Sequence, residues 1–296
     1  MKVVGLGQCS LDYITLLDGF PPEDEKKEVL DFTVQGGGPV ATALVTLSRL
    51  GVKTAIIGRV SDDPAGDEIR RGLKADGVDV KGLLAKPGGR SQQAVVMVNK
   101  KTGSRTICWQ RPTVEPLSER EVDPAFFKGA GFLLLDGLMT EASYKAAEHA
   151  IRLRIPVMLD AGSMRPGMLR LASMCDYVVS SDRFVSDLKL SIKEAFKKLR
   201  TGRTRAITVT VGDKGSFTFS DGKVYLQKAF KVKAVDTTGA GDVFHGAYAY
   251  GVIQGWDIKK TVEFASAVAA MKCRELGGRA GIPALNEALK FIKESK

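Results

Sequence analysis

The sequence predicts an α/β fold: a doubly wound, mostly parallel sheet flanked by helices, with a small β-sheet inserted as a lid. Strand and helix patterns alternate after Pro112, at residues 131–135, 141–152 and 157–160. Other extended segments follow one another without helices between them. The length of 296 residues is enough for one large core. We therefore expect a single domain, 1–296, with a discontinuous lid formed by about 10–35 and 88–112.

Composition restricts the function classes. The net charge is +10, from 44 Lys and Arg against 34 Asp and Glu, but no concentrated basic run with interleaved aromatics occurs, so we expect no nucleic-acid partner. No window approaches the roughly 18 apolar residues of a membrane span, and the N-terminus lacks a signal-peptide pattern. The four cysteines are too far apart for a C-x-x-C motif and are expected to be reduced and buried. These features favour a cytoplasmic enzyme whose basic surface suits phosphate-bearing ligands.

The first strand is expected at residues 2–7. Gly5-Leu-Gly7-x-x-Ser10 resembles a dinucleotide fingerprint, but that fingerprint requires a helix to follow at once, and residues 11–17 are strand-like. A nicotinamide site is therefore not expected. Asp12 follows the carboxyl end of the first strand, where α/β sheets bind ligands, and is either a ligand contact or a turn acid.

A run of three glycines at 36–38 precedes the first helix. An extended segment at 27–34 leads into it, and the glycines permit close approach of the backbone to a ligand. Pro39 suits the first turn of a helix, and apolar residues at helical spacing continue to Gly51. A second helix is expected at 64–74.

The lid is expected to be a sheet of extended segments. Residues 91–99 and 105–110 flank Lys100-Lys-Thr-Gly, which is expected to form a hairpin turn. With strands near Tyr13 and Val29 they would make a small sheet that covers a ligand. Four lid side chains are either ligand contacts or packing residues: Gln92, Gln93, Trp109 and Arg111.

One motif in the C-terminal half carries the chemistry. Asp236-Thr-Thr-Gly-Ala-Gly-Asp-Val-Phe-His-Gly-Ala joins a short apolar strand to a helix, and its glycines let successive amides face one point at the helix N-terminus. Asp242 is placed to accept a proton from a hydroxyl while a phosphoryl group passes over these amides. The plainer alternative is ordinary helix entry with an N-terminal acid. The anion hole would comprise the unpaired N–H groups of Gly239, Ala240, Gly241 and Asp242. The remaining elements are expected at 177–179, 206–211, 217–219, 224–226, 243–254 and about 258–274.

The motif Asp-Thr-Thr-Gly-Ala-Gly-Asp-x-Phe-x-Gly-Ala is similar to the C-terminal signature of the ribokinase, or phosphofructokinase-B (pfkB), family of carbohydrate kinases, and the match is nearly complete. The resemblance implies a ribokinase-like fold and a kinase that uses ATP and Mg²⁺ to phosphorylate a primary hydroxyl of a sugar or sugar derivative. It also implies that Asp242 is the general base. No G-x-x-x-x-G-K-[ST] sequence occurs, so a P-loop kinase is excluded.

The resemblance also implies ligand contacts. Residues 36–66 are similar to the family's N-terminal signature, in which an Asn touches the sugar, but this chain has Ala41 at that position, and this leaves the sugar open. The implied substrate contacts in this half are Asp12, Gly36, Gly37 and Gly38. The implied ATP contacts are Thr210, Gly212, Gly215 and Ser266, with Gly239 and Gly241 at the phosphates.

Three further implied contacts concern phosphate and metal ions. Ala-Gly-Ser-Met-Arg165-Pro is one residue longer than the family's Asp-x-Asn-x-Arg-Pro, so Arg165 is either a phosphate contact or a loop arginine. Asp182-Arg-Phe-Val stands where many relatives have Asn-x-x-Glu, which leaves Asp182 as a weak Mg²⁺ candidate. Asp236, Thr238 and the 277–281 loop match the surroundings of the family's monovalent-cation site, which indicates K⁺.

Within the family, Gly-Gly-Gly-Pro, Val-Phe-His-Gly and Gly-Gly-Arg-Ala-Gly-Ile-Pro are most similar to the sulfofructose-kinase, ketohexokinase-like branch. Lys26 matches a basic position that this branch offers to a sulfonate. Trp109 and Leu138, however, stand where the branch places its other sulfonate ligands, so the substrate is not carried over. The resemblance further implies a homodimer formed through the lid.

Two alternatives to a sugar kinase stay open. The first is a nucleoside kinase or an aldonic-acid kinase of the 2-keto-3-deoxygluconate type, which Ala41 permits. The second is a sugar- or nucleotide-binding regulator without turnover, favoured by the missing Asn-x-x-Glu and opposed by the intact Asp242. His245, three residues past that acid, is expected to be structural.

Overall fold

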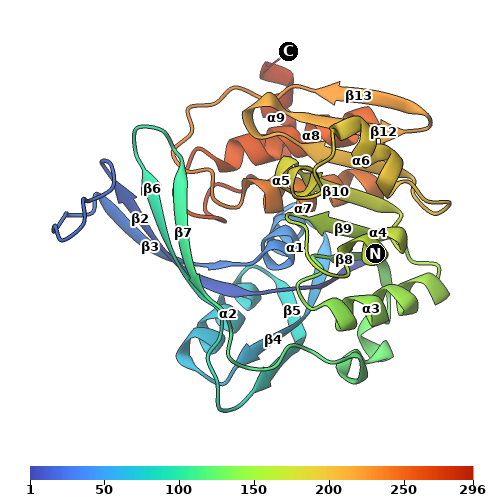
Figure 1. The fold of residues 1–296 in the computed structure, drawn as a ribbon, viewed down its shortest axis with the longest axis horizontal. Helices are drawn as coiled ribbons and strands as arrows, with labels where there is room; N and C mark the ends of the chain where they lie inside the picture. The colour runs from blue at the N-terminus through green and yellow to red at the C-terminus, as the bar shows by residue number, and fades with distance from the viewer. Residues whose placement is uncertain (296) are drawn as a thin grey trace.

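The computed structural model describes residues 1–295, which form two sheets and their flanking helices (Figure 1). The larger sheet has the strand order β13-β12-β11-β10-β9-β8-β1-β4-β5, and the smaller has the order β3-β2-β6-β7. The strands are β1 Lys2–Leu6, β2 Ser10–Leu17, β3 Asp31–Gly37, β4 Lys53–Ser61, β5 Val78–Lys86, β6 Gln93–Asn99, β7 Arg105–Gln110, β8 Ala130–Leu135, β9 Val157–Ala161, β10 Tyr177–Ser181, β11 Ala206–Thr210, β12 Ser216–Ser220 and β13 Lys223–Gln227. The α-helices are α1 Pro39–Arg49, α2 Pro64–Ala75, α3 Thr140–Arg152, α4 Met168–Ser173, α5 Asp182–Asp187, α6 Ile192–Leu199, α7 Ala240–Ile253, α8 Ile258–Lys272 and α9 Leu285–Glu294. Short 3-10 helices are η1 Glu119–Glu121, η2 Pro124–Phe127 and η3 Gly212–Lys214.

The large sheet is parallel from β5 to β11, and only its edge is antiparallel. β1 lies between β4 and β8 and pairs with both in parallel, so the winding of the chain reverses at β1. β11, β12 and β13 form an antiparallel meander at one edge. In such sheets, ligands bind beyond the carboxyl ends of the strands, near the reversal. The predicted doubly wound, mostly parallel sheet is confirmed.

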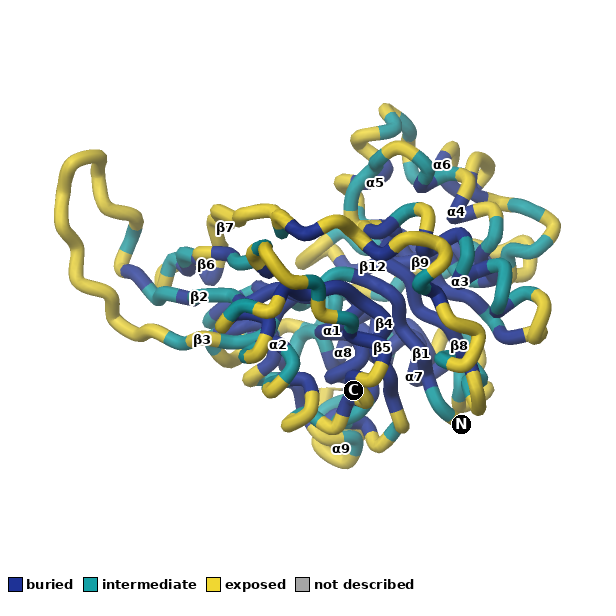
Figure 2. Tube along the Cα trace, turned by 90° about the horizontal axis from the view of Figure 1, so that it is seen from below, coloured by how far each residue is buried: buried dark blue, intermediate teal, exposed yellow. Residues whose placement is uncertain are grey.

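Helices cover both faces of this sheet and enclose two cores. α1, α2, α7 and α8 supply one core, which includes Leu44, Tyr248 and Phe264. α3, α4, α5 and α6 supply the other, which includes Leu171 and Phe184. The central strands are apolar on both faces, as buried parallel strands are, and Figure 2 shows them dark blue beneath an exposed surface. Among residues 1–295, no helix is both long and apolar enough to cross a membrane.

The small sheet projects to one side of the large sheet as the predicted lid (Figure 1). β2 pairs with β3 antiparallel and with β6 in parallel, and β6 and β7 form the predicted hairpin. β3 begins at Asp31, four residues later than expected. The inner face of the lid packs Ile14, Val96 and Val98 against Leu276. Loop 18–30 is almost entirely exposed and forms the far tip of the lid (Figure 2).

The predicted strand before Asp236 is wrong. Residues 228–236 are irregular, because the amides of Val235 and Asp236 both donate to the carbonyl oxygen of Cys273 and not to a neighbouring strand. Phe230 in this segment packs against Phe291 of α9, and the segment does not pair with a strand.

Some elements had no counterpart in the sequence predictions, namely β4, β5, α4, α5, α6 and α9. The apolar run of β4 is interrupted by Gly58 and Arg59, and Arg59 is buried in an ion pair with Glu121. α4 and α5 have six residues each, which is too short for a helical period to show.

The contact between α1 and α7 leaves no space at Gly246. A Cβ atom there would lie 2.5 Å from the carbonyl oxygen of Ala43 and 2.7 Å from Cβ of Thr46. We expect Gly246→Ala to lower the free energy of unfolding by about 1–3 kcal/mol, because the two helices would have to separate.

Gly72→Ala on α2 is the matched control for this substitution. Its Cβ would meet no atom within 4 Å, so we expect a gain of up to about 1 kcal/mol from helix propensity. Urea unfolding followed by circular dichroism measures both variants. Equal effects of the two substitutions would contradict the packing argument.

Candidate active site

The N-terminus of α7 is shaped by Gly239. This residue has φ +72°, and a Cβ atom on it would lie 2.9 Å from a carbonyl oxygen, so both conformation and space require glycine. The amides of Gly239, Gly241 and Asp242 have no acceptor among residues 1–295. The Ala240 amide, by contrast, donates to the carbonyl oxygen of Thr237 at 3.3 Å. The predicted set of four free amides is therefore reduced to three.

Asp242 stands in the first turn of α7 and is partly buried. Its pKa is raised to about 7, first by burial and then by the nearby carboxyl group of Asp160, while His245 and Arg105 oppose the rise. A carboxyl group with a pKa near 7 is a stronger base than an ordinary one and still gives up its proton at neutral pH. The turn thus holds an acid–base group beside free amides.

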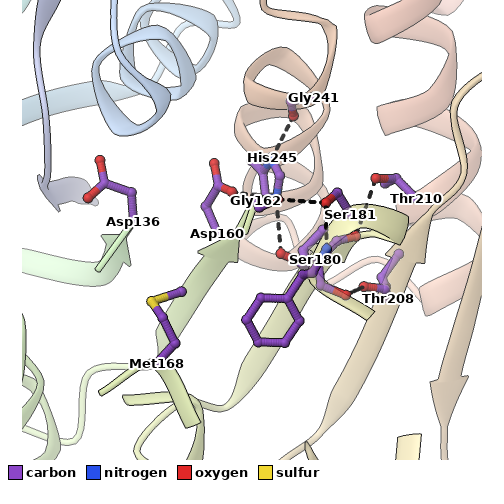
Figure 3. A network of polar contacts seen from close by, with 12 residues as sticks. Asp136, Asp160, Gly162, Met168, Ser180, Ser181, Thr208, Thr210, Gly241 and His245 are labelled. Carbon is purple, nitrogen blue, oxygen red and sulfur yellow. Dashed lines mark hydrogen bonds and ion pairs between the residues drawn. The ribbon is translucent and has the colours of Figure 1, made fainter. Parts of the chain in front are cut away.

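His245 anchors this turn to the sheet (Figure 3). Its Nδ1 lies 2.6 Å from the carbonyl oxygen of Gly241, and its Nε2 lies 3.1 Å from the carbonyl oxygen of Val179 on β10. Nε2 also lies 3.3 Å from Oδ1 of Asp160 on β9. Burial lowers the pKa of His245 and raises that of Asp160, so both groups favour their uncharged forms. These contacts hold α7 on the ends of β9 and β10.

Two buried acids at neighbouring strand ends were missed by the sequence predictions. Asp136 follows β8 and Asp160 lies in β9, and in Figure 3 their carboxyl groups point in the same direction. Asp136 accepts hydrogen bonds from the amides of Gln8 and Leu138. Oδ2 of Asp160 is buried and has no partner in the described part of the chain. The signal was available, because each acid ends an apolar run at the ligand-binding edge.

Asp12 and Trp109 share one face of the lid. The strand registers pair Asp12 with Gln35 and with Ala94, and they pair Ala94 with Trp109, so the four residues form one row. Ala94 belongs to the apolar cluster of the inner face, so the row faces the large sheet. Burial raises the pKa of Asp12. Trp109 is exposed, with the guanidinium of Arg111 4.7 Å from its ring centroid.

The glycines at 36–38 each have a close neighbour. A Cβ atom on Gly36 would meet the guanidinium of Arg279, and one on Gly37 would meet the carboxyl group of Asp12. Gly38 has φ +96° at the start of α1. The buried Arg279 donates to the carbonyl oxygen of Gly37 at 3.1 Å. The glycine run therefore brings Asp12 and a buried arginine together at the base of the lid.

The predicted ATP contacts lie on the later strands and helices. Thr210 ends β11, and its hydroxyl donates to the carbonyl oxygen of Ser180 at 3.3 Å. Gly212 and Gly215, with φ +60° and +100°, bound the turn that follows. Because β9, β10 and β11 are parallel, this turn lies at the same edge of the sheet as Asp160. Ser266 is buried in α8.

Arg165 lies in the loop after β9 and reaches the carboxyl end of β8. It donates to the carbonyl oxygen of Asp136 at 2.9 Å and to the hydroxyl of Ser163 at 3.1 Å. Its Nε is buried without a partner among residues 1–295. The protein therefore fixes this cation beside the two strand-end acids.

Two other predicted contacts lie apart from this group. Asp182 is exposed at the first residue of α5. Lys26 is exposed in loop 18–30. Strand β2 separates this loop from the glycines at 36–38, and its part from Asp12 to Leu17 is roughly 16 Å long at about 3.3 Å per residue.

The residues predicted for a monovalent cation bond to one another. Oδ1 of Asp236 accepts from the amide of Thr238 at 2.8 Å and from its hydroxyl at 2.7 Å, and Oδ2 accepts from the amide of Gly277 at 2.8 Å. Lys272, at the end of α8, is buried and donates Nζ to the carbonyl oxygen of Asp236 at 2.8 Å. No sequence prediction had placed this lysine in the site.

The β6–β7 hairpin reaches the same loop. The carbonyl oxygen of Gly103 accepts from the amide of Thr237 at 3.3 Å and from its hydroxyl at 3.2 Å. Arg105 donates to that hydroxyl at 3.0 Å. The lid is thus joined to the segment that enters α7.

Free amides at a helix N-terminus, a carboxyl base beside them and a lid over the strand ends define a site suited to the transfer of an anionic group to a hydroxyl. Residues 1–285 match the model of the pfkB family carbohydrate kinase, and the chain belongs to this family. Its class of activity is phosphotransfer to an alcohol group.

Relatives match along almost the whole chain. The ribokinase of Bacillus subtilis is 26% identical over 297 residues, which cover 97% of this chain and 98% of the relative. The 5-dehydro-2-deoxygluconokinase of Clostridium tetani is 25% identical over 322 residues, with 100% and 94% covered. The solved ribokinase of Thermotoga maritima has a TM-score of 0.83 at 25% identity and covers 98% of this chain and 99% of its own. The ribokinase-like fold is confirmed.

Asp242 should make stability depend on pH. Its pKa is about 7 in the folded protein against 3.8 for an ordinary Asp. Between these values the folded state binds more protons than the unfolded state, so the free energy of unfolding falls as the pH rises from about 4 to about 7. We expect Asp242→Asn to be more stable than the wild type at about pH 8, by at most about 4 kcal/mol for a shift of about three pKa units, and of similar stability near pH 4.

Denaturant unfolding at both pH values measures this difference. Glu25→Gln, which removes an exposed acid in loop 18–30, is the control and should change neither value. A variant at Asp242 that is less stable than the wild type at both pH values would contradict the raised pKa.

Proposed function

We propose that the protein is an ATP-dependent sugar kinase that transfers the γ-phosphate to a primary hydroxyl of a sugar or sugar derivative. The observation that carries this proposal is Asp242, a carboxyl group whose pKa is raised to about 7, beside three free amides. Membership of the pfkB family supports it. So does the shared fold of an Arabidopsis thaliana ribokinase complexed with ribose and ATP, with a TM-score of 0.83 at 24% identity.

In the proposed reaction, Asp242 takes the proton of the acceptor hydroxyl while the oxygen of that hydroxyl attacks the γ-phosphorus. The bond between that phosphorus and the bridging oxygen of ADP breaks. The amides of Gly239 and Gly241, with the positive end of the α7 dipole, stabilise the charge on the phosphoryl oxygens. The products are ADP and a phosphorylated sugar, and the proton leaves Asp242 to solvent.

The acceptor would bind between the strand ends and the lid. Asp12, on the inner face, accepts hydrogen bonds from sugar hydroxyls, and the glycine run at 36–38 lets the backbone approach the sugar. Trp109, in the same row, would cover the sugar from the lid. Arg165 supplies a fixed cation at the carboxyl end of β8.

Mg²⁺ fits the carboxyl group of Asp160 on β9. Oδ2 of Asp160 is buried and unpaired within residues 1–295, which makes it a better candidate than the exposed Asp182. No group of three or more His, Cys, Asp or Glu in that range could hold a metal ion, so the nucleotide phosphates would supply the other ligands. When bound, Mg²⁺ neutralises charge on the transferred group. A solved structure of this fold from E. coli is a complex with ATP and Mg²⁺.

The nucleotide would lie over the later strands. Thr210 and the turn from Gly212 to Gly215 would contact the phosphates and the ribose, largely through backbone groups. Ser266, in the helix packed on α7, would line the adenine side. This arrangement brings the γ-phosphate over the α7 terminus.

A nucleoside or aldonic-acid kinase of the same family is the second candidate. Ala41 is fully buried on α1, and its methyl group offers no hydrogen bond to a sugar hydroxyl. The relative from Clostridium tetani, a 5-dehydro-2-deoxygluconokinase, supports an acceptor other than a simple pentose. A panel of acceptors distinguishes these classes.

Removal of the base tests the mechanism. We expect Asp242→Asn to lower kcat/KM for the best acceptor by about 10²–10⁴-fold, because Asn keeps the shape but cannot accept a proton. In the wild type, kcat/KM should rise with pH and level off above about 7, since the base must be ionised. ADP release with ATP and Mg²⁺ is measured against ketoses, aldoses, sugar phosphates, sulfo-sugars, aldonic acids and nucleosides.

ATP binding to the same variant, measured by calorimetry, is the control and should be retained. Turnover that survives in Asp242→Asn would reject it as the base. An inactive wild type that still binds ATP across the whole panel would favour a regulator without turnover.

We also propose a homodimer formed through the outer face of the lid. The registers place Val34, Tyr13, Val95 and Cys108 in one row, and this row alternates with the inner row of Ala94. Val34, Val95 and Cys108 are exposed, which corrects the prediction that all four cysteines are buried. An exposed apolar sheet face of this kind marks an interaction surface.

Val95→Asp should convert a dimer into a monomer in size-exclusion chromatography with light scattering, because it places a charge at the centre of this face. Val224→Asp on β13, also an exposed valine, is the matched control and should leave the mass unchanged. A wild type that is monomeric at high concentration would reject the proposed dimer.

A further inference from the structure

Lys272 is a fully buried lysine at the end of α8. Lysine is almost never fully buried unless it is paired, because its charge has to leave water. Its Nζ donates to the carbonyl oxygen of Asp236 at 2.8 Å. An ammonium group thus lies beneath the segment that enters α7.

Each oxygen atom of Asp236 already accepts a hydrogen bond. The two carboxylate oxygens accept from Thr238 and from the amide of Gly277, and the carbonyl oxygen accepts from Lys272. Asp236 itself is 0% exposed. A metal cation bound to these oxygens would lie beside the ammonium group of Lys272, and the two like charges would repel. The residues present therefore do not fit the monovalent cation expected from the sequence.

The 277–281 loop contacts the backbone of this lysine and reaches the anion hole. A Cβ atom on Gly281 would lie 2.4 Å from the carbonyl oxygen of Lys272, and one on Gly239 would lie 2.9 Å from the carbonyl oxygen of Gly278. The loop is therefore in close contact with Lys272 at one end and with the α7 terminus at the other. Lys272 is therefore linked through this loop to the turn that presents the free amides.

We propose that the Lys272 ammonium group takes the place of the monovalent cation, so that the protein needs neither K⁺ nor another alkali ion to hold its anion hole in shape. Lys272 is a positioning residue in this account. The kcat measurements that test this role rest on the proposed kinase function, whereas the melting-temperature measurements do not.

The wild type should give the same kcat within about twofold in KCl, NaCl and tetramethylammonium chloride of equal ionic strength. Its melting temperature should likewise not depend on which cation is present. Lys272→Ala leaves a small space next to Asp236, so in tetramethylammonium it should lose at least tenfold in kcat and melt at a lower temperature. K⁺ or NH₄⁺ should restore part of both losses, because these ions are small enough to enter.

Lys290→Ala on α9 is the matched control, since this lysine is exposed and its ion-pair partner is Glu294 on the same helix. It should behave as the wild type in all three salts. Activation of the wild type by K⁺ of tenfold or more over tetramethylammonium, or a rise of its melting temperature in K⁺ alone, would overturn the proposal. So would a Lys272→Ala variant that equals the wild type in every salt.

The wild-type salt series keeps the proposal testable if Lys272→Ala does not fold. If no acceptor is phosphorylated, the kinase proposal fails while the melting temperatures of the wild type in the three salts still decide the role of Lys272.

Discussion

The buried carboxylate of Asp236 is the constraint on which the active-site geometry depends. It accepts hydrogen bonds from Thr238 and from Gly277, which joins the entry to α7 to the loop after α8. This junction sets the turn at Gly239, and the turn leaves three amides free at the helix N-terminus. The turn and its free amides are therefore held by hydrogen bonds within the protein.

The ionised carboxyl group of Asp242 in the same region lowers the stability of the folded protein. Asp242 ionises near neutral pH only against burial and a neighbouring carboxyl group, so its charged form is less favourable in the folded protein than in the unfolded chain. Catalytic bases gain proton affinity in this way, and the rest of the fold has to offset the loss. His245 keeps the first turn of α7 in place despite this cost, because it contacts the carbonyl oxygens of Gly241 and Val179.

Local chemistry made part of this structure predictable from the sequence. The glycines and the acid of the Asp236 motif act within one turn, so their spacing alone indicated free amides beside a base. The hairpin from β6 to β7 and the helix α1 were predicted for the same reason, because Gly103 and Gly51 mark their turns locally. The strand expected before Asp236 failed because pairing depends on a distant partner, and Cys273 takes its amides.

The residues that were missed act across long separations in sequence. Asp160 matters because β9 places it next to His245, which is 85 positions later by the difference of their residue numbers. Lys272 contacts Asp236 because α8 returns to the segment before α7. A motif shows which atoms are available at one turn, but it does not show which atom from elsewhere already occupies the space beside them. For that reason the sequence indicated K⁺ near Asp236 but did not indicate that Lys272 contacts the same residue.

The lid and the anion hole share one segment, and this links substrate coverage to the geometry of catalysis. Thr237 is bonded to Gly103 and Arg105 at the tip of the β6–β7 hairpin, and it lies between Asp236 and Thr238. A movement of the hairpin therefore acts on the turn that Asp236 and Lys272 hold from beneath. Because the inner row of the lid contains Asp12 and Trp109, a sugar bound there would favour one position of the lid. Binding of the acceptor and formation of the phosphate site would then be parts of one equilibrium.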